Sequence, residues 1–186
     1  MLLGSALLVA CSARPRLRSL SPKMATVTPA KVTRAAPSRA VQIFAKHQLA
    51  LRDSIVRLAL AQVGTRYEFG GTTPVEGFDC SGLVRYVFAQ LYLAPPRLAS
   101  KQARSGAPVR RGQLRPGDLL TFGVGDSVTH VGIYVGERKF VHASSVGGRV
   151  IVSSLDRPPS DLIRPLKGAR RFLAFHEPFE QRLGGN

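Results

Sequence analysis

The order of two apolar patterns along the chain constrains the fold more than any other feature of the sequence. Apolar side chains recur at three- and four-residue spacing in 53–64 and in 80–91, which predicts two amphipathic helices. Asp53 is expected to cap the first helix and Gly64 to end it. Short runs separated by Gly, Asp and Ser then predict strands over 118–122, 130–135, 139–143, 149–153 and 171–175. Helices followed by antiparallel strands indicate an α+β domain.

Size and charge exclude several classes of function. A chain of 186 residues suits one domain with extensions. No apolar run reaches the roughly 18 to 20 residues that a membrane-spanning helix needs, which excludes a multi-pass membrane protein. The net charge of +16 favours an anionic partner, but more than half of it lies in 12–60, and no helix-turn-helix, zinc-finger or aromatic-interleaved motif is present. An anionic membrane or wall polymer is therefore expected, and nucleic acid is not.

The first eleven residues predict an exported lipoprotein. The apolar run from Met1 to Ala10 is too short to span a membrane and is typical of the apolar part of an export signal. Leu8-Val9-Ala10-Cys11 resembles the lipobox of bacterial lipoproteins, which implies cleavage before Cys11 and lipidation of that residue. No Lys or Arg precedes the run, so an ordinary apolar N-terminus is the alternative.

Residues 12–45 are rich in Arg, Lys, Ser, Pro and Ala and show little apolar periodicity. Such a segment cannot bury enough apolar surface to offset the entropy lost on ordering, so it is predicted to be a basic disordered tether. The predicted organisation is a signal peptide over 1–11, the tether over 12–45, a folded domain over 46–178 and a tail over 179–186.

Cys80 is the candidate nucleophile. It stands at the predicted start of a helix, where backbone N–H groups and the helix dipole favour a thiolate. The small residues Ser81 and Gly82 are expected to leave the sulfur accessible and to let a substrate backbone approach. The alternative is a helix cap made by Asp79, with Cys80 an incidental core residue.

His130 and His142 are the candidates for the base. They lie on consecutive predicted strands, and a three-residue loop over 136–138 pairs residue 132 with residue 142. This register makes the two histidines diagonal neighbours on one face of the sheet, so one imidazole can orient the other.

Zinc binding is the competing use of Cys80, His130 and His142, since three ligands and an open position would form a catalytic metal site. Thiol chemistry explains better why the cysteine begins a helix after a Gly-rich loop, so no metal or other cofactor is expected. The remaining histidines, His47 and His176, are expected to be solvated bystanders.

Five motifs follow one another along the chain: Tyr67-Glu68-Phe69-Gly70-Gly71, Gly77-Phe78-Asp79-Cys80-Ser81-Gly82-Leu83-Val84, Pro116-Gly117-Asp118-Leu119, His130-Val131-Gly132-Ile133-Tyr134 and Phe140-Val141-His142-Ala143-Ser144. In this order they resemble the NlpC-type family of papain-like cell-wall cysteine peptidases. The resemblance implies a papain-like fold with the cysteine on a helix packed against an antiparallel sheet. It implies a substrate as well, the stem peptide of peptidoglycan, usually cut between γ-D-glutamyl and the diamino acid.

The resemblance also assigns roles to single residues. Cys80 matches the nucleophile, His130 the general base and His142 the polar residue that orients it. Tyr67 matches a tyrosine that serves the oxyanion or the substrate carbonyl, and the backbone N–H of Cys80 is a candidate oxyanion donor on helix-terminus grounds. Two further residues, Asp79 and Ser81, match positions that in some members hold the free amine of a stem-peptide L-Ala.

The sequence also departs from the family pattern. Arg66 replaces a common Pro before the tyrosine, and Leu98-Ala99 replaces a Thr-Ser pair that often follows Pro-Arg, although Pro96, Arg97 and Gln102 fit. The rim of the cleft is therefore expected to differ from that of other members.

The sequence as a whole predicts a monomeric bacterial murein hydrolase of the cell envelope, exported and anchored to a membrane through lipidated Cys11. A catalytically silent wall-binding or scaffolding lipoprotein of the same fold is the alternative. The intact set of Cys80, His130 and His142 argues against silence, because a pseudoenzyme is free to lose any of them. Cleavage of a D-Ala cross-link is the alternative to cleavage after γ-D-glutamate.

Overall fold

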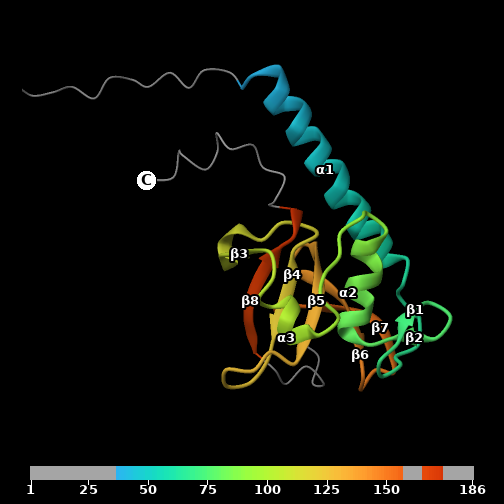
Figure 1. Ribbon diagram of the computed structural model, residues 1–186. Helices are drawn as coiled ribbons and strands as arrows, with labels where there is room; N and C mark the ends of the chain where they lie inside the picture. The colour runs from blue at the N-terminus through green and yellow to red at the C-terminus, as the bar shows by residue number, and fades with distance from the viewer. Residues whose placement is uncertain (1–36, 157–164, 174–186) are drawn as a thin grey trace, which may run out of the picture. The chain divides into compact units, whose positions relative to one another are not determined.

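The computed structural model describes residues 37–156 and 165–173, which begin with a long helix, α1 (Arg39–Leu60) (Figure 1). The side chain of Ser38 caps α1 by accepting a hydrogen bond from the N–H of Val41. The helix predicted to start at Asp53 therefore starts much earlier, within the range 12–45 assigned to the tether. Its first half is mostly exposed and lacks a regular apolar stripe, so the periodicity showed only the second half.

The helix that carries Cys80 is confirmed. It is α2 (Cys80–Ala89), and Asp79 is its N-cap. Its fully buried face packs against the sheet. A one-turn helix, α3 (Ala99–Gln102), follows α2 in the chain. The buried apolar residues of α2 are Leu83, Val84, Val87 and Phe88.

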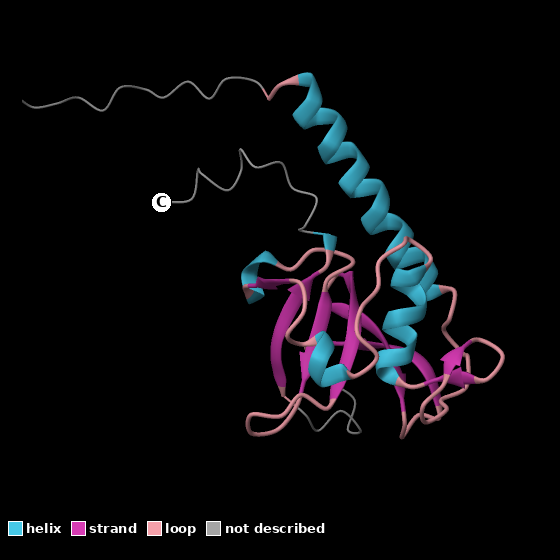
Figure 2. Ribbon diagram, in the orientation of Figure 1, coloured by secondary structure: helices cyan, strands magenta, loops and turns pink. Residues whose placement is uncertain are grey.

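Six antiparallel strands form the main sheet, in the spatial order β3-β8-β4-β5-β6-β7 (Figure 2). They are β3 (Ala107–Val109), β4 (Leu119–Phe122), β5 (His130–Gly136), β6 (Lys139–Ser144), β7 (Arg149–Ser154) and β8 (Leu166–Arg171). Two short strands, β1 (Thr72–Thr73) and β2 (Gly77–Phe78), form a separate hairpin, and a 3₁₀ turn, η1 (Arg111–Gln113), follows β3. The α+β, papain-like architecture is confirmed.

Four of the five predicted strands are confirmed, and the fifth is wrong. A strand was predicted over 171–175, but the last strand of the sheet, β8, runs from Leu166 to Arg171 and ends where the predicted one begins. Its sequence, Leu-Lys-Gly-Ala-Arg-Arg, has no alternation of apolar and polar residues, although the strand is paired on both sides. Hydrogen bonding to β3 and β4, rather than local pattern, therefore places this strand.

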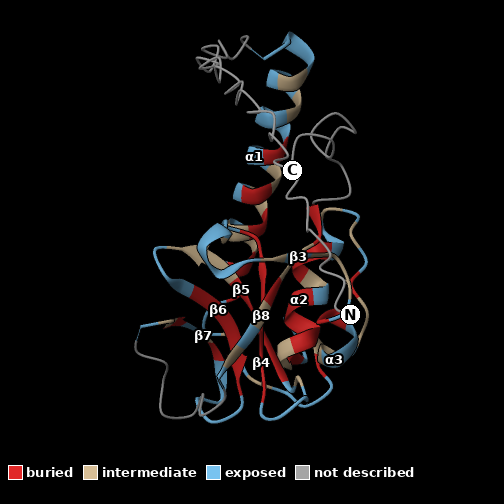
Figure 3. Ribbon diagram, turned by 90° about the vertical axis from the view of Figure 1, so that its left-hand side faces the viewer, coloured by how far each residue is buried: buried red, intermediate tan, exposed pale blue. Residues whose placement is uncertain are grey.

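The core lies between the helices and one face of the sheet, where buried residues gather (Figure 3). α1 contributes Ile55 and Ala59 to it, and the facing strands contribute Val131, Ile133 and Val141. A smaller apolar cluster, which includes Phe122 and Phe140, belongs to the opposite side chains of the same strands. Of the helices in the described ranges, none has the length and apolar character needed to cross a membrane.

Asp118 joins α1 to the sheet through buried charge. Its carboxylate is fully buried and accepts two hydrogen bonds from the guanidinium of Arg171, each of 2.8 Å, and one from the N–H of Arg115. The buried guanidinium of Arg52, on α1, lies 3.6 Å from the same carboxylate and also donates to the carbonyl of Pro116. One carboxylate thus connects α1, β8 and the loop before β4.

We predict that Asp118→Asn lowers the free energy of unfolding by about 3 kcal/mol, because the buried guanidinium of Arg52 and the partly buried one of Arg171 lose the negative charge that compensates them. The measurement is equilibrium unfolding in urea. Asp156→Asn is the matched control, since Asp156 pairs with Arg138 on the exposed surface, where an ion pair contributes about 1 kcal/mol at most. Equal losses in both variants would contradict the role given to Asp118.

Candidate active site

The start of α2 fixes the position of Cys80. The Oδ1 atom of Asp79 accepts a hydrogen bond of 2.6 Å from the N–H of Gly82, which closes the first turn of the helix. A Cβ at Gly82 would lie 2.0 Å from the carbonyl oxygen of Gly71, so only glycine fits. The expectation that Gly82 makes room for a substrate backbone is therefore corrected, because the chain's own Gly71 loop takes that room.

Cys80 is partly buried, and its environment does not by itself favour a thiolate. Burial raises the pKa of the Cys80 thiol above its ordinary value, and the charge of Asp79 raises it further. Hydrogen bonds from the backbone N–H groups of Val131, Ser81 and Cys80 act in the opposite direction, but the net shift is upward. The helix start is thus insufficient to ionise the thiol, and a nearby base is needed.

The contact with Val131 brings the sulfur of Cys80 to β5. Val131 follows His130 directly, so the sulfur lies beside the first residues of that strand. The predicted nucleophile and the predicted base thus belong to two elements that pack against each other.

His130 and His142 meet as predicted. His130 Nε2 lies 2.9 Å from His142 Nδ1, and both side chains are buried. Ile133 pairs with Val141, the register that was expected. The turn differs, since Glu137 and Arg138 form a two-residue turn with positive φ angles, and an irregularity between Tyr134 and Gly136 restores the register.

The hydrogen-bonded chain continues to Ser153. His142 Nε2 lies 2.9 Å from the Oγ of this buried serine on β7. If His142 donates to Ser153, its Nδ1 accepts the N–H of His130 Nε2, and Nδ1 is then the basic nitrogen of His130. This tautomer suits a general base that receives a proton at Nδ1.

Sequence reasoning missed Ser153. Val141 pairs with Val152 and His142 pairs with Ile151, so Ser153 is the diagonal neighbour of His142 on the same face. The predicted strand bounds do not give this contact, because strands over 139–143 and 149–153 leave a five-residue loop and pair residue 142 with residue 150, one position away from the observed register.

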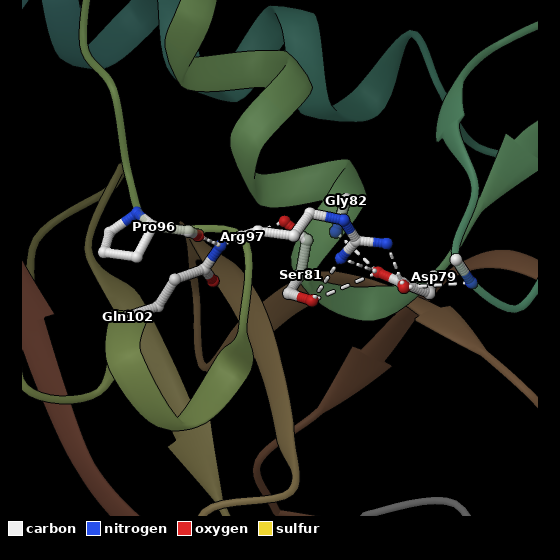
Figure 4. Close-up of polar contacts among 7 residues, drawn as sticks. Asp79, Ser81, Gly82, Pro96, Arg97 and Gln102 are labelled. Atoms are coloured by element: carbon white, nitrogen blue, oxygen red, sulfur yellow. Dashed lines mark hydrogen bonds and ion pairs between the residues drawn. The ribbon is translucent and has the colours of Figure 1, made fainter.

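Asp79, Ser81 and Arg97 form a connected polar network beside Cys80 (Figure 4). Arg97 donates two hydrogen bonds to the carboxylate of Asp79 and one to the hydroxyl of Ser81. Tyr67 lies close by in the fold, because its backbone bridges to that of Phe78. Asp79, Ser81 and Tyr67 are therefore gathered around the start of α2.

A comparison with protein-family models matches residues 64–161 to the NlpC/P60 family, more than half of the chain. The chain belongs to the NlpC/P60 family. The chain is 42% identical over 121 residues to a probable endopeptidase of Mycobacterium tuberculosis, covering 65% of this chain and 29% of that protein. It is 46% identical over 96 residues to the murein DD-endopeptidase MepS/murein LD-carboxypeptidase of Escherichia coli, covering 51% and 50%. The chain thus spans half or less of these curated relatives.

Solved structures of the family have the same fold. The peptidoglycan hydrolase RipB of Mycobacterium tuberculosis superposes with a TM-score of 0.59 at 30% identity, over 74% of this chain and 72% of that one. The NlpC/p60 domain of the peptidoglycan hydrolase SagA gives a TM-score of 0.56 at 31% identity, over 64% and 97%.

Other residues singled out in the sequence fall away from this site. His47 is exposed on α1, as expected of a solvated histidine. Cys11 and His176 lie outside the described residues. Within the described part of the NlpC/P60 domain, no three His, Cys, Asp or Glu side chains are grouped so that they could hold a metal ion.

We predict that His130→Ala moves the pH dependence of Cys80 alkylation to higher pH. Burial and the charge of Asp79 raise the pKa of the Cys80 thiol, so the thiol reacts at neutral pH only where a base takes its proton, and the variant without His130 should need more alkaline solution. Wild type should react at neutral pH. The measurement is the rate of iodoacetamide modification, followed by mass spectrometry of the peptide containing Cys80.

His47→Ala is the matched control, and its pH profile should equal that of wild type. A His130→Ala profile at or below the wild-type pH would show that His130 does not act as the base for Cys80.

Proposed function

We propose that this protein is a peptidoglycan hydrolase that cuts amide bonds of the stem peptide with a cysteine nucleophile. The observation that carries the proposal is the buried chain His130–His142–Ser153, next to a cysteine that needs a base. A silent wall-binding protein would have no use for a cysteine and a base held at the start of α2 and β5. The named relatives, a murein endopeptidase and peptidoglycan hydrolases, support the same substrate.

In the proposed reaction, His130 takes the proton of the Cys80 thiol, and the thiolate attacks the carbonyl carbon of the scissile amide. The tetrahedral oxyanion receives hydrogen bonds from the backbone N–H of Cys80 and from the hydroxyl of Tyr67. The C–N bond then breaks, and the leaving amine takes the proton from His130. A water molecule, deprotonated by His130, cleaves the thioester, and the proton returns to the thiol as the carboxylate leaves.

The bond we propose is the one between γ-D-glutamate and the diamino acid. A γ-DL-glutamyl hydrolase of Bacillus subtilis, 35% identical over 121 residues, supports this choice. The D-Ala cross-link is the second candidate, favoured by the DD-endopeptidase activity in the name of the Escherichia coli relative.

We predict that the wild-type protein cleaves defined muropeptides and that Cys80→Ala abolishes cleavage without unfolding the domain. The products, identified by mass spectrometry, decide the bond: a disaccharide that keeps only L-alanyl-D-glutamate, with release of the peptide that begins at the diamino acid, marks the first candidate, and monomers released from cross-linked dimers mark the second. His130→Ala should lose more activity than His142→Ala, because His142 orients the base but does not transfer the proton. Activity of Cys80→Ala near that of wild type would exclude the thiolate mechanism.

We also propose that the protein is exported and held at a membrane by a lipid on Cys11. The lipobox-like sequence supports this, and Arg14, Arg16 and Arg18 follow it closely. Acyl chains stabilise membrane association by about 0.8 kcal/mol per buried CH₂, and each basic residue near anionic headgroups adds about 1 kcal/mol.

Cys11→Ser is expected to move the protein from the membrane fraction to a soluble or uncleaved form, because the acyl chains are then absent. The activity of the purified protein should not change, since the residue is remote in sequence from Cys80. Fractionation of cells that express both forms measures this. A Cys11→Ser protein that stays in the membrane at high salt would contradict the lipid anchor.

A further inference from the structure

The first half of α1 lies beside a groove that the proposed reaction does not use. In Figure 1 this half of the helix extends beyond the end of α2 and the sheet. The groove has a volume of about 420 Å³, and we call it the α1 groove. It is lined by apolar residues of α1 and by polar and basic ones, which include Val41, Phe44, Leu49, Gln48, Arg52 and, from the loop before β4, Arg115. An occupant of the α1 groove should therefore combine apolar and polar groups.

Gln48 leaves an unmet hydrogen bond in the α1 groove. Its side chain is only 9% exposed, and its buried Nε2 has no hydrogen-bond partner among the described residues. A buried amide donor without an acceptor is unfavourable, and native proteins nearly always provide one. The occupant of the groove is therefore expected to bring an oxygen acceptor, either a carboxylate or a backbone carbonyl.

The charge of the α1 groove favours an anionic occupant. Arg115 is exposed, and its guanidinium makes no hydrogen bond or ion pair with another described residue. The nearby carboxylate of Asp118 already binds Arg171 and lies beside Arg52. Burial lowers the pKa of Arg52, and the positive charges of Arg171 and Arg115 lower it further, against the opposing charge of Asp118. A second negative charge at the groove would therefore be stabilised.

The end of β8 brings the chain to this groove. Arg171, the last residue of β8, shares the carboxylate of Asp118 with Arg52, which lines the groove. Residues 174–186 follow shortly afterwards in the sequence. Along α1, the distance from Arg52 to Val41 is about 16 Å, because a helix rises about 1.5 Å per residue. Ten extended residues span about 33 Å, so the following segment is long enough to reach along the whole groove.

The sequence of this C-terminal segment complements the α1 groove. Phe175, Phe179 and Leu183 provide large apolar side chains at a spacing of four residues. Glu177 and Glu180 lie between them and outnumber the single Arg of the segment, whereas the whole chain has a net charge of +16. The segment thus carries the apolar groups and the negative charge that the groove favours.

We propose that residues 174–186 bind in the α1 groove and hold the first half of α1 against the domain. Phe175 and Phe179 pack on the apolar lining, and a glutamate of the segment pairs with Arg115. A carboxylate or a backbone carbonyl of the segment accepts the hydrogen bond of Gln48. The docking involves no residue of the reaction centre, so it does not depend on the proposed function.

The test is hydrogen–deuterium exchange of the full-length protein, measured in peptides that cover 41–49 of α1. Wild type should exchange slowly there, because the bound segment opposes local unfolding of the helix. The double variant Phe175→Asp/Phe179→Asp should exchange about 10- to 100-fold faster in 41–49, since it loses two apolar anchors, and at the wild-type rate in α2. Asn186→Ala is the matched control in the same segment and should exchange like wild type.

A second comparison tests the ion pair. Glu177→Gln/Glu180→Gln and Arg115→Gln should each accelerate exchange in 41–49. The variant that combines all three changes should exchange no faster than either parent, because each parent already lacks the pair. If the double Phe variant also exchanges faster in α2, it destabilises the whole domain, and these charge variants decide instead.

Three results would overturn the inference. The first is fast exchange in 41–49 of wild type, and the second is exchange that none of the segment variants changes. The third is protection that disappears on dilution as a dimer dissociates in sedimentation equilibrium, which would assign the α1 groove to a second copy of the chain.

Discussion

The carboxylate at the N-terminus of α2 holds together the parts from which the site is built. Asp79 closes the first turn of the helix through Gly82, receives the N–H of Gly70 and pairs with Arg97. Cys80, the next residue, therefore cannot move independently of the two loops that flank it. The close approach of the Gly71 carbonyl to Gly82 adds a steric restraint to these hydrogen bonds. Positioning the nucleophile is thus a property of three segments distant in sequence.

This arrangement has an electrostatic cost that Arg97 limits. A negative charge next to Cys80 opposes ionisation of the thiol, and burial opposes it more strongly. A helix start therefore does not supply a thiolate here, and its backbone N–H groups only reduce the penalty. Arg97 neutralises the charge of Asp79. The carboxylate can therefore fix the geometry of α2 and raise the pKa of the Cys80 thiol less than an unpaired carboxylate would. His130, as the base, must offset the rest of this penalty when it takes the proton of Cys80.

Sequence reasoning succeeded where local pattern determines structure. The helix at Cys80 has a regular apolar stripe, and the His130–His142 contact follows from a short hairpin whose register survives a change of turn type. It failed for the first half of α1, which is exposed and carries no such stripe, and for β8, whose place depends on pairing with distant strands. The buried pairing of Asp118 with Arg171 joins residues 53 positions apart, and no spacing rule indicates such a contact.

The hydrogen-bonded chain from His130 ends in a neutral hydroxyl. His142 and Ser153 orient the base through dipoles, and neither places a negative charge against the imidazolium that forms when Cys80 loses its proton. A carboxylate in the place of His142 would stabilise that imidazolium more and make it a weaker acid. With a neutral partner, His130 returns its proton more readily to the leaving amine. The partly buried position of Cys80 complements this, because a thiolate that is poorly stabilised in the ground state is a stronger nucleophile once formed.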